Sequence, residues 1–472
     1  METLRSPMDW AQSQFGACCL GDKRRTERLV HVGCSMLSRS SASIPKQMHG
    51  LSDVKGAYRL FGMEKVTHEA VSRPHWDSTR NLARLPDQGL VLFVQDQTEL
   101  NYGPRPDSYG LGFTSDTRGR GIELQTSLCV VPDPTGLGRP EVLGIALQTP
   151  WLRTHAPRKK TETSKERSSR RTEYDTWEES VVAIGPAPSP ETGTTWVSVG
   201  DRASDVFSHL FRATELGWRC LIRSRHDRKL KGSNEPGRLH EMARSLEPMG
   251  STSISLRSRP AQKKTALRAP KATKKARTVH LNVAYFSDRI EGLSQGKKRS
   301  SLDLSCIRVW EDPLNLPAPD RIEWLLLTTL PVNSLEDALH AVQLYRQRWL
   351  IEEYHKCLKT GCKMENRNLN HASKLLALLG VLSIVAVFLL QLKTPNPRMK
   401  PPDELIQLVR RITKAKEDLG RPSALLRRIA MLGGFLGRKS DGEPGWQTIW
   451  DGWTRLQDIL WGIELAEAIR CG

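Results

Sequence analysis

A strand–helix–strand pattern between residues 194 and 225 is the feature that most constrains the fold. TTWVSVGD has the apolar, β-branched character of a buried strand and ends at Asp201. SDVFSHLFRATELG follows with helical periodicity, and WRCLIRSR has the character of a second strand. Two strands joined by one helix at this spacing form a βαβ unit, whose strands are parallel. The pattern therefore predicts an α/β fold with a sheet that is at least partly parallel.

Further strand-like segments surround this unit. GLVLFVQDQTELNY, from residue 89, is predicted to be a buried strand that ends at Asp96, and GIELQTSLCVV and EVLGIALQTPWL are the next two candidates. A polar, charged stretch at 158–180 is expected to be exposed. Isolated strands with basic connectors at 226–320, followed by EWLLLTTL, predict a β-insertion within the α/β domain.

Several helices are also predicted, one of them apolar all round. Residues 375–392 form an 18-residue run without a charge, close to the minimum length for a membrane span. The run is single and contains Gly380, Ser383 and Gln391, which favours a buried core helix over a membrane span. A long helix is predicted before it, at 334–360. The last 27 residues carry an apolar stripe at helical spacing that is expected to pack internally or between subunits: Trp446, Ile449, Trp450, Trp453, Leu456, Leu460, Trp461 and Ile463.

The charge balance indicates the class of partner. The 472 residues include 71 Lys and Arg against 52 Asp and Glu, a formal net charge of +19. Such an excess favours a polyanion, either nucleic acid or an anionic membrane, over a merely soluble basic surface. One block, 257–277, carries nine basic residues and no acid, as flexible phosphate-binding arms do. The nine cysteines form no CxxC pair, which indicates reduced thiols and no structural zinc.

Three acids and a set of phosphate-binding side chains are the candidate site. Asp96 and Asp201 are predicted at the ends of buried strands, from which a carboxylate can reach a cleft. In the predicted helix 334–360, four residues fall on one stripe about 60° wide, which excludes the neighbouring Glu353. The four are Tyr345, Arg348, Glu352 and Lys359. A solvated charged face and i,i+4 ion pairing remain the alternatives for this stripe.

Three carboxylates are the donor set that a two-metal phosphodiester site requires. Each of two divalent ions needs anionic oxygens, and magnesium prefers few carboxylates completed by water and phosphate oxygens. Carboxylates brought this close raise one another's pKa unless a cation relieves the repulsion. The pattern therefore favours Mg²⁺, with Mn²⁺ as a substitute and two ions per site.

These motifs together resemble the DDE transposases of insertion sequence family four. QDQTELNY around Asp96 and VGDRASD around Asp201 are similar to the family's first and second acid strands. YRQRWLIEEYHKCLKTG fills every position of its Tyr-x2-Arg-x3-Glu-x6-Lys signature. LGDKRRTERL with GAYRLF resembles the N-terminal end-recognition domain, and the segment from LGGFLGRK to TRLQ resembles the C-terminal assembly domain.

The resemblance implies a ribonuclease H-like catalytic domain at residues 71–396, with its β-insertion at about 226–320. A helical DNA-binding domain would occupy residues 1–70, and a helical dimerisation domain residues 397–472. Asp96, Asp201 and Glu352 would be the catalytic, metal-binding triad. Trp324 would stack on a flipped base, which replaces lost base stacking, although core packing is the alternative for this residue alone. The implied DNA contacts are Tyr345, Arg348, Lys359, Arg223, Arg24, Arg25, Arg28 and Arg59.

The expected function is cut-and-paste transposition in the bacterial cytoplasm. The partners would be double-stranded DNA, as inverted-repeat transposon ends and as target, and a second copy of the chain in a synaptic homodimer, with no membrane. The resemblance adds a hairpin intermediate and cutting in trans. The alternatives are a nuclease of the same fold without strand transfer and an inactive DNA-binding regulator. Lys46 and Lys55 lie where the similarity fades, consistent with recognition of a different terminal repeat.

Overall fold

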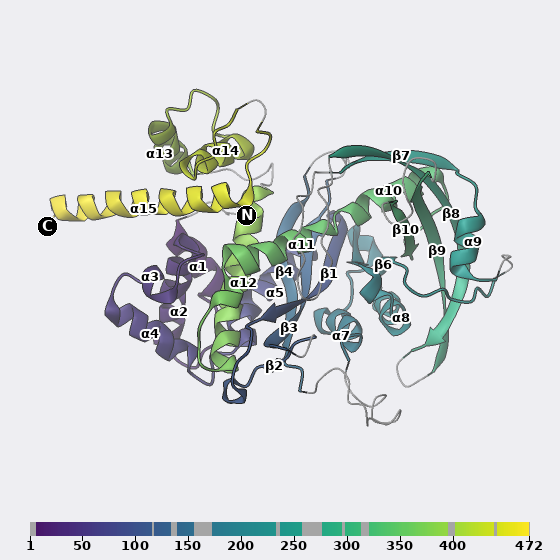
Figure 1. The fold of residues 1–472 in the computed structure, drawn as a ribbon, viewed down its shortest axis with the longest axis horizontal. Coiled ribbons are helices and arrows are strands. Elements are labelled where there is room, and N and C mark those ends of the chain that lie inside the picture. The colour runs from purple at the N-terminus through teal and green to yellow at the C-terminus, as the bar shows by residue number, and fades with distance from the viewer. Residues whose placement is uncertain are drawn as a thin grey trace. The chain divides into compact units, whose positions relative to one another are not determined.

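The computed structural model describes most of the chain as two compact units (Figure 1). Unit 1 consists of Met1–Thr172, Pro190–Thr194 and Trp349–Gly472, and unit 2 of Glu173–Ser189 and Thr195–Arg348. The described residues are 6–115, 118–133, 139–154, 172–232, 237–256, 276–294, 298–312, 321–394, 402–438 and 441–471. The basic block 257–277 lies almost entirely outside this set, so its predicted role as an arm stays a prediction.

Unit 1 begins with a helical region. It contains α1 (Pro7–Phe15), α2 (Lys23–Ser38), α3 (Ile44–Gln47), α4 (Leu51–Phe61) and α5 (His68–Ala83). Asp22 caps α2, because its side chain accepts a hydrogen bond from the backbone N–H of Arg24. Thr67 caps α5 in the same way. The predicted helical N-terminal region is therefore confirmed.

The unit 1 sheet is antiparallel. It comprises β1 (Gly89–Asn101), β2 (Gly112–Phe113), β3 (Arg120–Val131) and β4 (Glu141–Trp151), with β1 on one side of β3 and β4 and β2 on the other. The prediction that β1 ends at Asp96 is wrong, since the ladder to β3 continues to Asn101. Residues 91–95 are buried, whereas 96–99 are half-buried. The apolar signal therefore stops before the hydrogen-bonded strand does.

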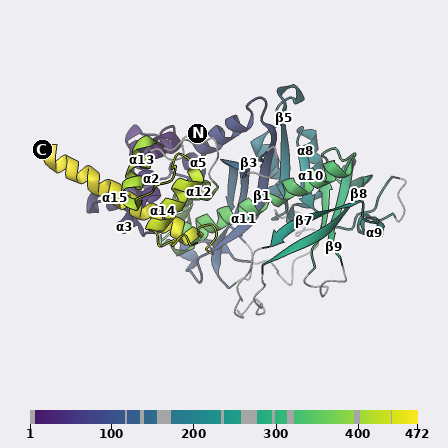
Figure 2. The same cartoon turned by 90° about the horizontal axis from the view of Figure 1, so that it is seen from above.

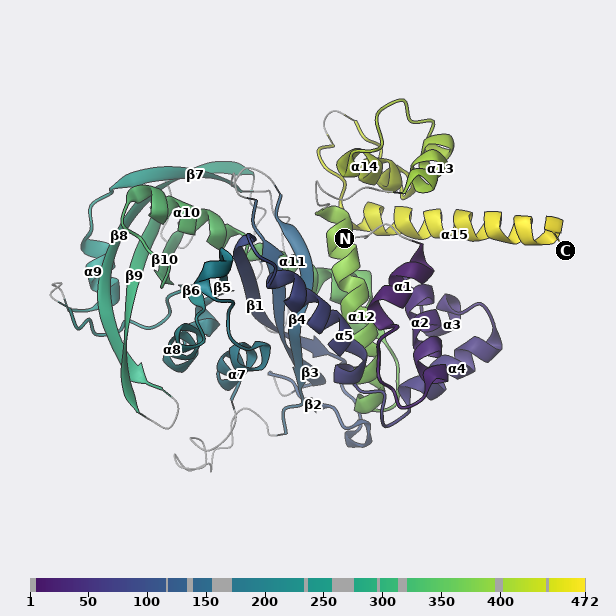
Figure 3. The ribbon, with the colours of Figure 1, turned by 180° about the vertical axis from the view of Figure 1, so that it is seen from behind.

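The apolar run forms α12 (Ala372–Lys393), the central helix of unit 1. It packs against α2, α4, α5, α15 and β4, and Figure 3 shows it running between α5 and the first helices. By length and composition α12 could cross a membrane, but 89% of its most apolar 18-residue stretch is buried inside the protein. The prediction of a buried core helix is confirmed. Gly380 permits the close approach of α5, since a Cβ there would lie 3.1 Å from the carbonyl oxygen of His68.

The helix predicted at 334–360 is interrupted. It consists of α10 (Leu335–Arg346), α11 (Trp349–Lys356) and a π-helical turn η7 (Cys357–Gly361). The N–H groups of Gln347 and Arg348 bond to carbonyls three residues earlier, which tightens the backbone and ends α10. The π turn then widens it. The prediction of one continuous helix is therefore wrong, and the stripe, whose angles assumed an uninterrupted α-helix from Tyr345 to Lys359, stays a prediction.

The C-terminal helices are α13 (Asp403–Thr413), α14 (Pro422–Leu432) and α15 (Trp446–Cys471), which lie side by side in Figure 1. The predicted apolar stripe divides along α15. Its first half is buried: Trp453 donates a hydrogen bond to the carbonyl oxygen of Leu37, and Arg39 pairs with Asp458 at 2.8 Å. Its second half exposes four large apolar side chains, Trp461, Ile463, Leu465 and Ile469.

The strands of unit 2 follow one another in the sheet in the order β5, β6, β10, β9, β8, β7. The strands are β5 (Thr194–Gly200), β6 (Arg219–Arg223), β7 (Gly250–Leu256), β8 (Arg277–Leu293), β9 (Arg299–Glu311) and β10 (Glu323–Thr328). β5 and β6 are parallel and joined through α8 (Phe207–Glu215), which confirms the predicted βαβ unit. The remaining pairs are antiparallel.

The helices of unit 2 pack on this sheet. α9 (Leu239–Ser245) contacts β8 and β9, and Figure 2 shows α10 crossing strands of the same sheet. α7 (Asp175–Ile184) packs on α8. The expectation that residues 158–180 are exposed is wrong for their described end, because Trp177 on α7 is fully buried. Acidic residues on either side of Trp177 make this segment polar on average, although one face of the short helix is apolar.

Three buried histidines predict a loss of stability in mild acid. Burial lowers the pKa of His68, His75 and His209 to about 4. In the unfolded chain these histidines take up protons near pH 6.5. The free energy of unfolding therefore has its full value above pH 6.5 and decreases as the pH falls toward 4. Each imidazole should contribute about 1.4 kcal/mol per pH unit across this window. We expect the midpoint of thermal unfolding to fall steadily from pH 6.5 to pH 5, measured by calorimetry.

His75→Gln is the informative variant for this prediction. The Nε2 of His75 accepts a hydrogen bond from the N–H of Ile145, and its Nδ1 faces the Gln14 side-chain oxygen at 2.7 Å. A glutamine keeps one acceptor and one donor but does not titrate. The pH dependence should become shallower in this variant, and a wild-type midpoint that stays flat down to pH 5 would contradict the prediction.

Candidate active site

The predicted site residues are divided between the two units. Unit 1 carries Asp96, Glu352 and Lys359, together with the N-terminal arginines. Unit 2 carries Asp201, Arg223, Trp324, Tyr345 and Arg348. Between Arg348 and Glu352 the chain passes from unit 2 to unit 1, at the peptide bond between Arg348 and Trp349. Each half of the candidate site has its own local geometry.

Asp201 lies at the carboxyl end of the parallel strand β5, as predicted. Its Oδ1 accepts a hydrogen bond of 2.7 Å from the N–H of Ala203, which caps the short turn η3 (Arg202–Ser204). Four residues further on, the buried Asp205 pairs with Arg228 and accepts the N–H groups of Arg225 and His226. The loop after β6 is thereby tied to the turn that carries Asp201.

Three arginines and a tyrosine gather around Asp201. Burial, followed by the positive charge of Arg202, lowers the pKa of Arg223, while Tyr345 and Asp201 raise it. Burial raises the pKa of Tyr345, and Arg348 and Arg223 partly offset this. The Nε of Arg223 is buried without a hydrogen-bond partner among the described residues. Like charges gathered around an unsatisfied donor favour a bound anion. Sequence reasoning missed Arg202, whose only signal was its position beside Asp201.

Trp324 lies beside Tyr345 in unit 2. The two rings form an edge-to-face pair with centroids 5.7 Å apart. Trp324 is half-buried at the start of β10, so it is not a simple core residue. The preceding Glu323 forms a two-pronged ion pair with Arg244 of α9, and its carbonyl oxygen accepts a 2.7 Å hydrogen bond from Arg223. These contacts fix the backbone that presents the indole.

In unit 1, Asp96 meets α11. The strand position of Asp96 faces Thr126 of β3, and its Oδ2 lies 3.9 Å from the Nδ1 of His355. Burial lowers the pKa of His355 to about 3, and the nearby Lys359 adds to the effect. The imidazole is therefore neutral at pH 7 and brings no positive charge to Asp96. The sequence analysis missed His355, although it stands three residues after Glu352 and thus on a neighbouring face of the helix.

Glu352 and Glu353 differ in their surroundings. Because Glu352 is one helical turn before His355, it lies toward the side of α11 that reaches Asp96. The carboxylate of Glu353 instead lies 3.9 Å from the Nζ of Lys393, at the end of α12. The structure thus separates the two adjacent acids, as the sequence analysis expected, although on a shorter helix than predicted.

Lys359 occupies the π turn. Its Nζ donates a 2.6 Å hydrogen bond to the carbonyl oxygen of Glu99 in β1 and lies 3.7 Å from Glu365. Gly361 closes this turn where a Cβ would lie 3.0 Å from both Leu389 and Trp450. Lys359 therefore ties the end of α11 to the strand of Asp96. π turns inserted into α-helices are frequent at functional sites.

Neither unit by itself supplies all three carboxylates that would bind a hard divalent cation. Unit 1 supplies the carboxylates of Asp96 and Glu352, and unit 2 supplies that of Asp201. Within either unit, the described residues include no group of three or more His, Cys, Asp or Glu side chains placed to hold a metal. Oxygen donors without cysteine match magnesium or manganese rather than zinc.

The predicted N-terminal contacts are exposed or half-buried on α2 and α4. Arg24 pairs with Asp22 at 3.1 Å and Arg28 with Asp53 at 3.0 Å, while Arg25 donates to the carbonyl oxygen of Leu20. Arg59 is exposed, with no partner among the described residues. Surface ion pairs of this kind are weak, so these arginines can exchange their carboxylates for phosphates at little cost.

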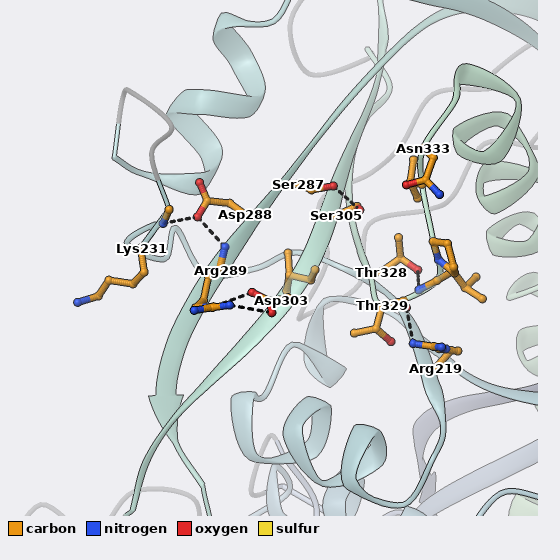
Figure 4. A pocket seen from close by; sticks show the side chains of 15 residues that line it. Arg219, Lys231, Ser287, Asp288, Arg289, Asp303, Ser305, Thr328, Thr329 and Asn333 are labelled. Atoms are coloured by element: carbon orange, nitrogen blue, oxygen red, sulfur yellow. Dashed lines mark hydrogen bonds and ion pairs between the residues drawn. The ribbon is translucent and has the colours of Figure 1, made fainter. Parts of the chain in front are cut away.

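A separate pocket of about 660 Å³ lies in unit 2, between β8, β9 and the segment after β10 (Figure 4). Arg289 in its wall pairs with Asp303 at 2.7 Å, Lys231 with Glu291 at 3.2 Å, and Arg219 donates to the carbonyl oxygen of Thr329. None of the predicted site residues lines it. Since its charges are already paired within the protein, the pocket is not the candidate active site.

Two known protein families match segments of this chain. Residues 7–66 match the family described as transposase DNA-binding, which covers α1 to α4. Residues 148–388 match the transposase DDE domain, which covers half of the chain and includes Asp201 and Glu352. Asp96 precedes the matched segment. The chain therefore belongs to the DDE transposase family, with a transposase DNA-binding domain at its N-terminus.

Proposed function

We propose that this DNA transposase binds inverted-repeat transposon ends, excises them by metal-dependent strand cleavage and joins the 3′ ends to target DNA. The observation that carries the proposal is the DDE domain match together with a carboxylate on each of β1, the end of β5 and α11. The proposal places the protein in insertion sequence family four, as a relative of the transposase of transposon five. It includes a ribonuclease H-like arrangement of the catalytic domain.

In this proposal Asp96, Asp201 and Glu352 are the three acids of the DDE motif and hold two Mg²⁺ ions, with Mn²⁺ as a substitute. When bound, the ions would activate water or a 3′ hydroxyl and stabilise the leaving oxygen. The placement of His355 supports this assignment, because its ring lies 3.9 Å from the Oδ2 of Asp96 and brings α11, the helix of Glu352, to the strand of Asp96. Burial of part of the site would strengthen the binding of both metal and phosphate.

The surrounding side chains would position the DNA strand. Arg348, Arg223 and Tyr345 lie near Asp201 and present guanidinium and hydroxyl donors to phosphate oxygens. Lys359 supplies an ammonium at the opposite end of α11. Trp324 forms an edge-to-face pair with Tyr345 and would stack on a base flipped from the duplex. Arg24, Arg25, Arg28 and Arg59 would bind the transposon end.

The proposed assembly is a homodimer that holds two ends and cuts them in trans. The second half of α15 supports it, since Trp461, Ile463, Leu465 and Ile469 are 38–74% exposed. Trp461, Leu465 and Ile469 recur every four residues and so lie along one face of α15, and exposed apolar side chains grouped in this way favour association with a partner surface. Residues 397–472 would serve as the dimerisation domain, and the protein would act in the cytoplasm on chromosomal DNA.

The third acid can be tested by two neighbouring substitutions. Glu352→Gln should reduce cleavage of end-containing DNA by at least about a thousandfold, because an amide cannot replace an anionic metal ligand. Binding of the end, measured by gel shift, should stay within about twofold. Glu353→Gln removes only the contact with Lys393 and should cleave at close to the wild-type rate. Equal losses in both variants would contradict the assignment of Glu352.

Trp324 offers a test of the hairpin intermediate. Trp324→Ala should slow hairpin formation or opening more than the first nick, since base–aromatic stacking contributes about 1–3 kcal/mol per base. Denaturing gels of end-labelled DNA separate the nicked, hairpin and fully cut products. Trp324→Phe retains a stacking face and should recover most of the effect. A hairpin step that is unchanged in Trp324→Ala would remove this role.

Strand transfer separates a transposase from a nuclease of the same fold. Pre-cleaved ends incubated with the protein, Mg²⁺ and a supercoiled plasmid should give joined products that disappear when the metal is chelated. A protein that hydrolyses DNA but never forms such products would be a nuclease. A protein that binds ends without either reaction would be an inactive regulator.

A further inference from the structure

One amide side chain lies at the centre of a buried polar network in unit 1. Gln148 of β4 is 2% exposed and its Oε1 accepts hydrogen bonds from His68 at 3.0 Å and Ser383 at 2.6 Å. Its Nε2 donates to the hydroxyls of Thr126 and Tyr354, both at 3.0 Å. All four hydrogen-bonding capacities of the amide are therefore used.

The network fixes the protonation of its members. Because Gln148 Oε1 is the acceptor, the Nε2 of His68 must carry the proton. Burial lowers the pKa of His68 to about 4, so the ring is neutral at physiological pH. Tyr354 is fully buried and points its hydroxyl toward the carbonyl oxygen of Ser383 at 3.5 Å. A neutral, fully satisfied network in an apolar core defines one arrangement of its elements.

One side of the network leads to Asp96. In the antiparallel registers, Asp96 of β1 pairs with Thr126 of β3, and Thr126 pairs with Gln148 of β4. Directly opposed residues of antiparallel strands place their side chains on the same face of the sheet. Asp96, Thr126 and Gln148 thus form a row across one face, which is also where His355 of α11 reaches Asp96.

The other side of the network leads to Glu352. Tyr354 lies two residues after Glu352 on α11, so the two side chains point about 200° apart around the helix. A hydrogen bond that holds Tyr354 in the core therefore fixes the rotation of α11 and with it the direction of Glu352. α11 has only eight residues and is bounded by a tight turn and a π turn. The backbone on either side of α11 therefore constrains the rotation of this helix about its axis only weakly.

We propose that Gln148 is a positioning residue for the metal site, which holds Asp96 and Glu352 at a set separation by bonding both the strand row and Tyr354. The amide spans the sheet and α11, and His68 extends the same network to α5, the helix that follows the DNA-binding domain. An apolar residue would fill the space but would let α11 rotate relative to β1. This inference rests on the proposed metal chemistry of Asp96 and Glu352.

Tyr354→Phe is the sharpest test, because it removes one hydroxyl and keeps the ring. We expect the Mg²⁺ concentration for half-maximal nicking to rise by about tenfold, as when an outer partner of a metal ligand is lost. Mn²⁺ binding, followed by the electron paramagnetic resonance signal of free Mn²⁺, should weaken by about the same factor. Binding of end DNA in the absence of metal should not change.

Tyr102→Phe is the matched control. Tyr102 is also buried in unit 1, at 7% exposure, and its hydroxyl has no hydrogen-bond partner among the described residues. This variant should retain wild-type Mg²⁺ and Mn²⁺ dependence. Thr126→Val removes a different hydrogen bond from Gln148 and should shift both metal curves in the same direction as Tyr354→Phe, which keeps the test available if one variant folds poorly.

The outcomes separate this inference from the proposed function. Variants that unfold at lower temperature but keep the wild-type metal curves would overturn the positioning role and leave Gln148 as a core residue. A wild-type protein that shows no metal-dependent nicking would instead contradict the proposed function itself. Weakened metal binding in Tyr354→Phe and Thr126→Val, with no change in Tyr102→Phe, is the result that supports the inference.

Discussion

The burial of α12 is the constraint on which unit 1 depends. A helix that is apolar on every side must be covered on every side, and no single segment of the chain can do this. The covering elements come from the N-terminal helices, from β4 and from the first half of α15. The hydrophobic effect thereby gathers the DNA-binding region, the strand of Asp96 and the C-terminal helix into one compact unit.

Polar groups inside this apolar core are costly unless each finds a partner. Gln148, His68, Thr126, Tyr354 and Ser383 satisfy one another almost completely. His75 is satisfied separately by Ile145 and Gln14. Hydrophobic contacts alone would tolerate several rotations of a short helix, whereas directional hydrogen bonds select one. The hydrogen bonds of this network thus define the orientation of α11, which burial of apolar side chains alone would define less well.

Unit 2 has a different electrostatic character. Arg202, Arg223 and Arg348 gather near one carboxylate, Asp201, and burial makes the charged form of Arg223 less favourable. The repulsion among like charges is relieved when an anion binds, so such a cluster favours the binding of phosphate. Asp205 and Glu323 hold the loops that carry these groups through their own ion pairs. The acids that form these ion pairs are therefore distinct from Asp201, the acid proposed to bind metal.

The sequence alone determined the strand–helix–strand unit and the apolar core helix, because buried strands and apolar runs are local properties of the chain. The sequence motifs also predicted a DDE transposase, which the family match confirms, whereas the assignment of the three acids stays a prediction. The extent of β1 beyond Asp96 depended on pairing with β3, which hydropathy does not record. The breaks around α11 arose from backbone hydrogen bonds and from close packing at Gly361. Only the tertiary structure brought His355 to Asp96 and Gln148 to Tyr354, since these contacts join residues far apart in the chain through burial and directional bonding.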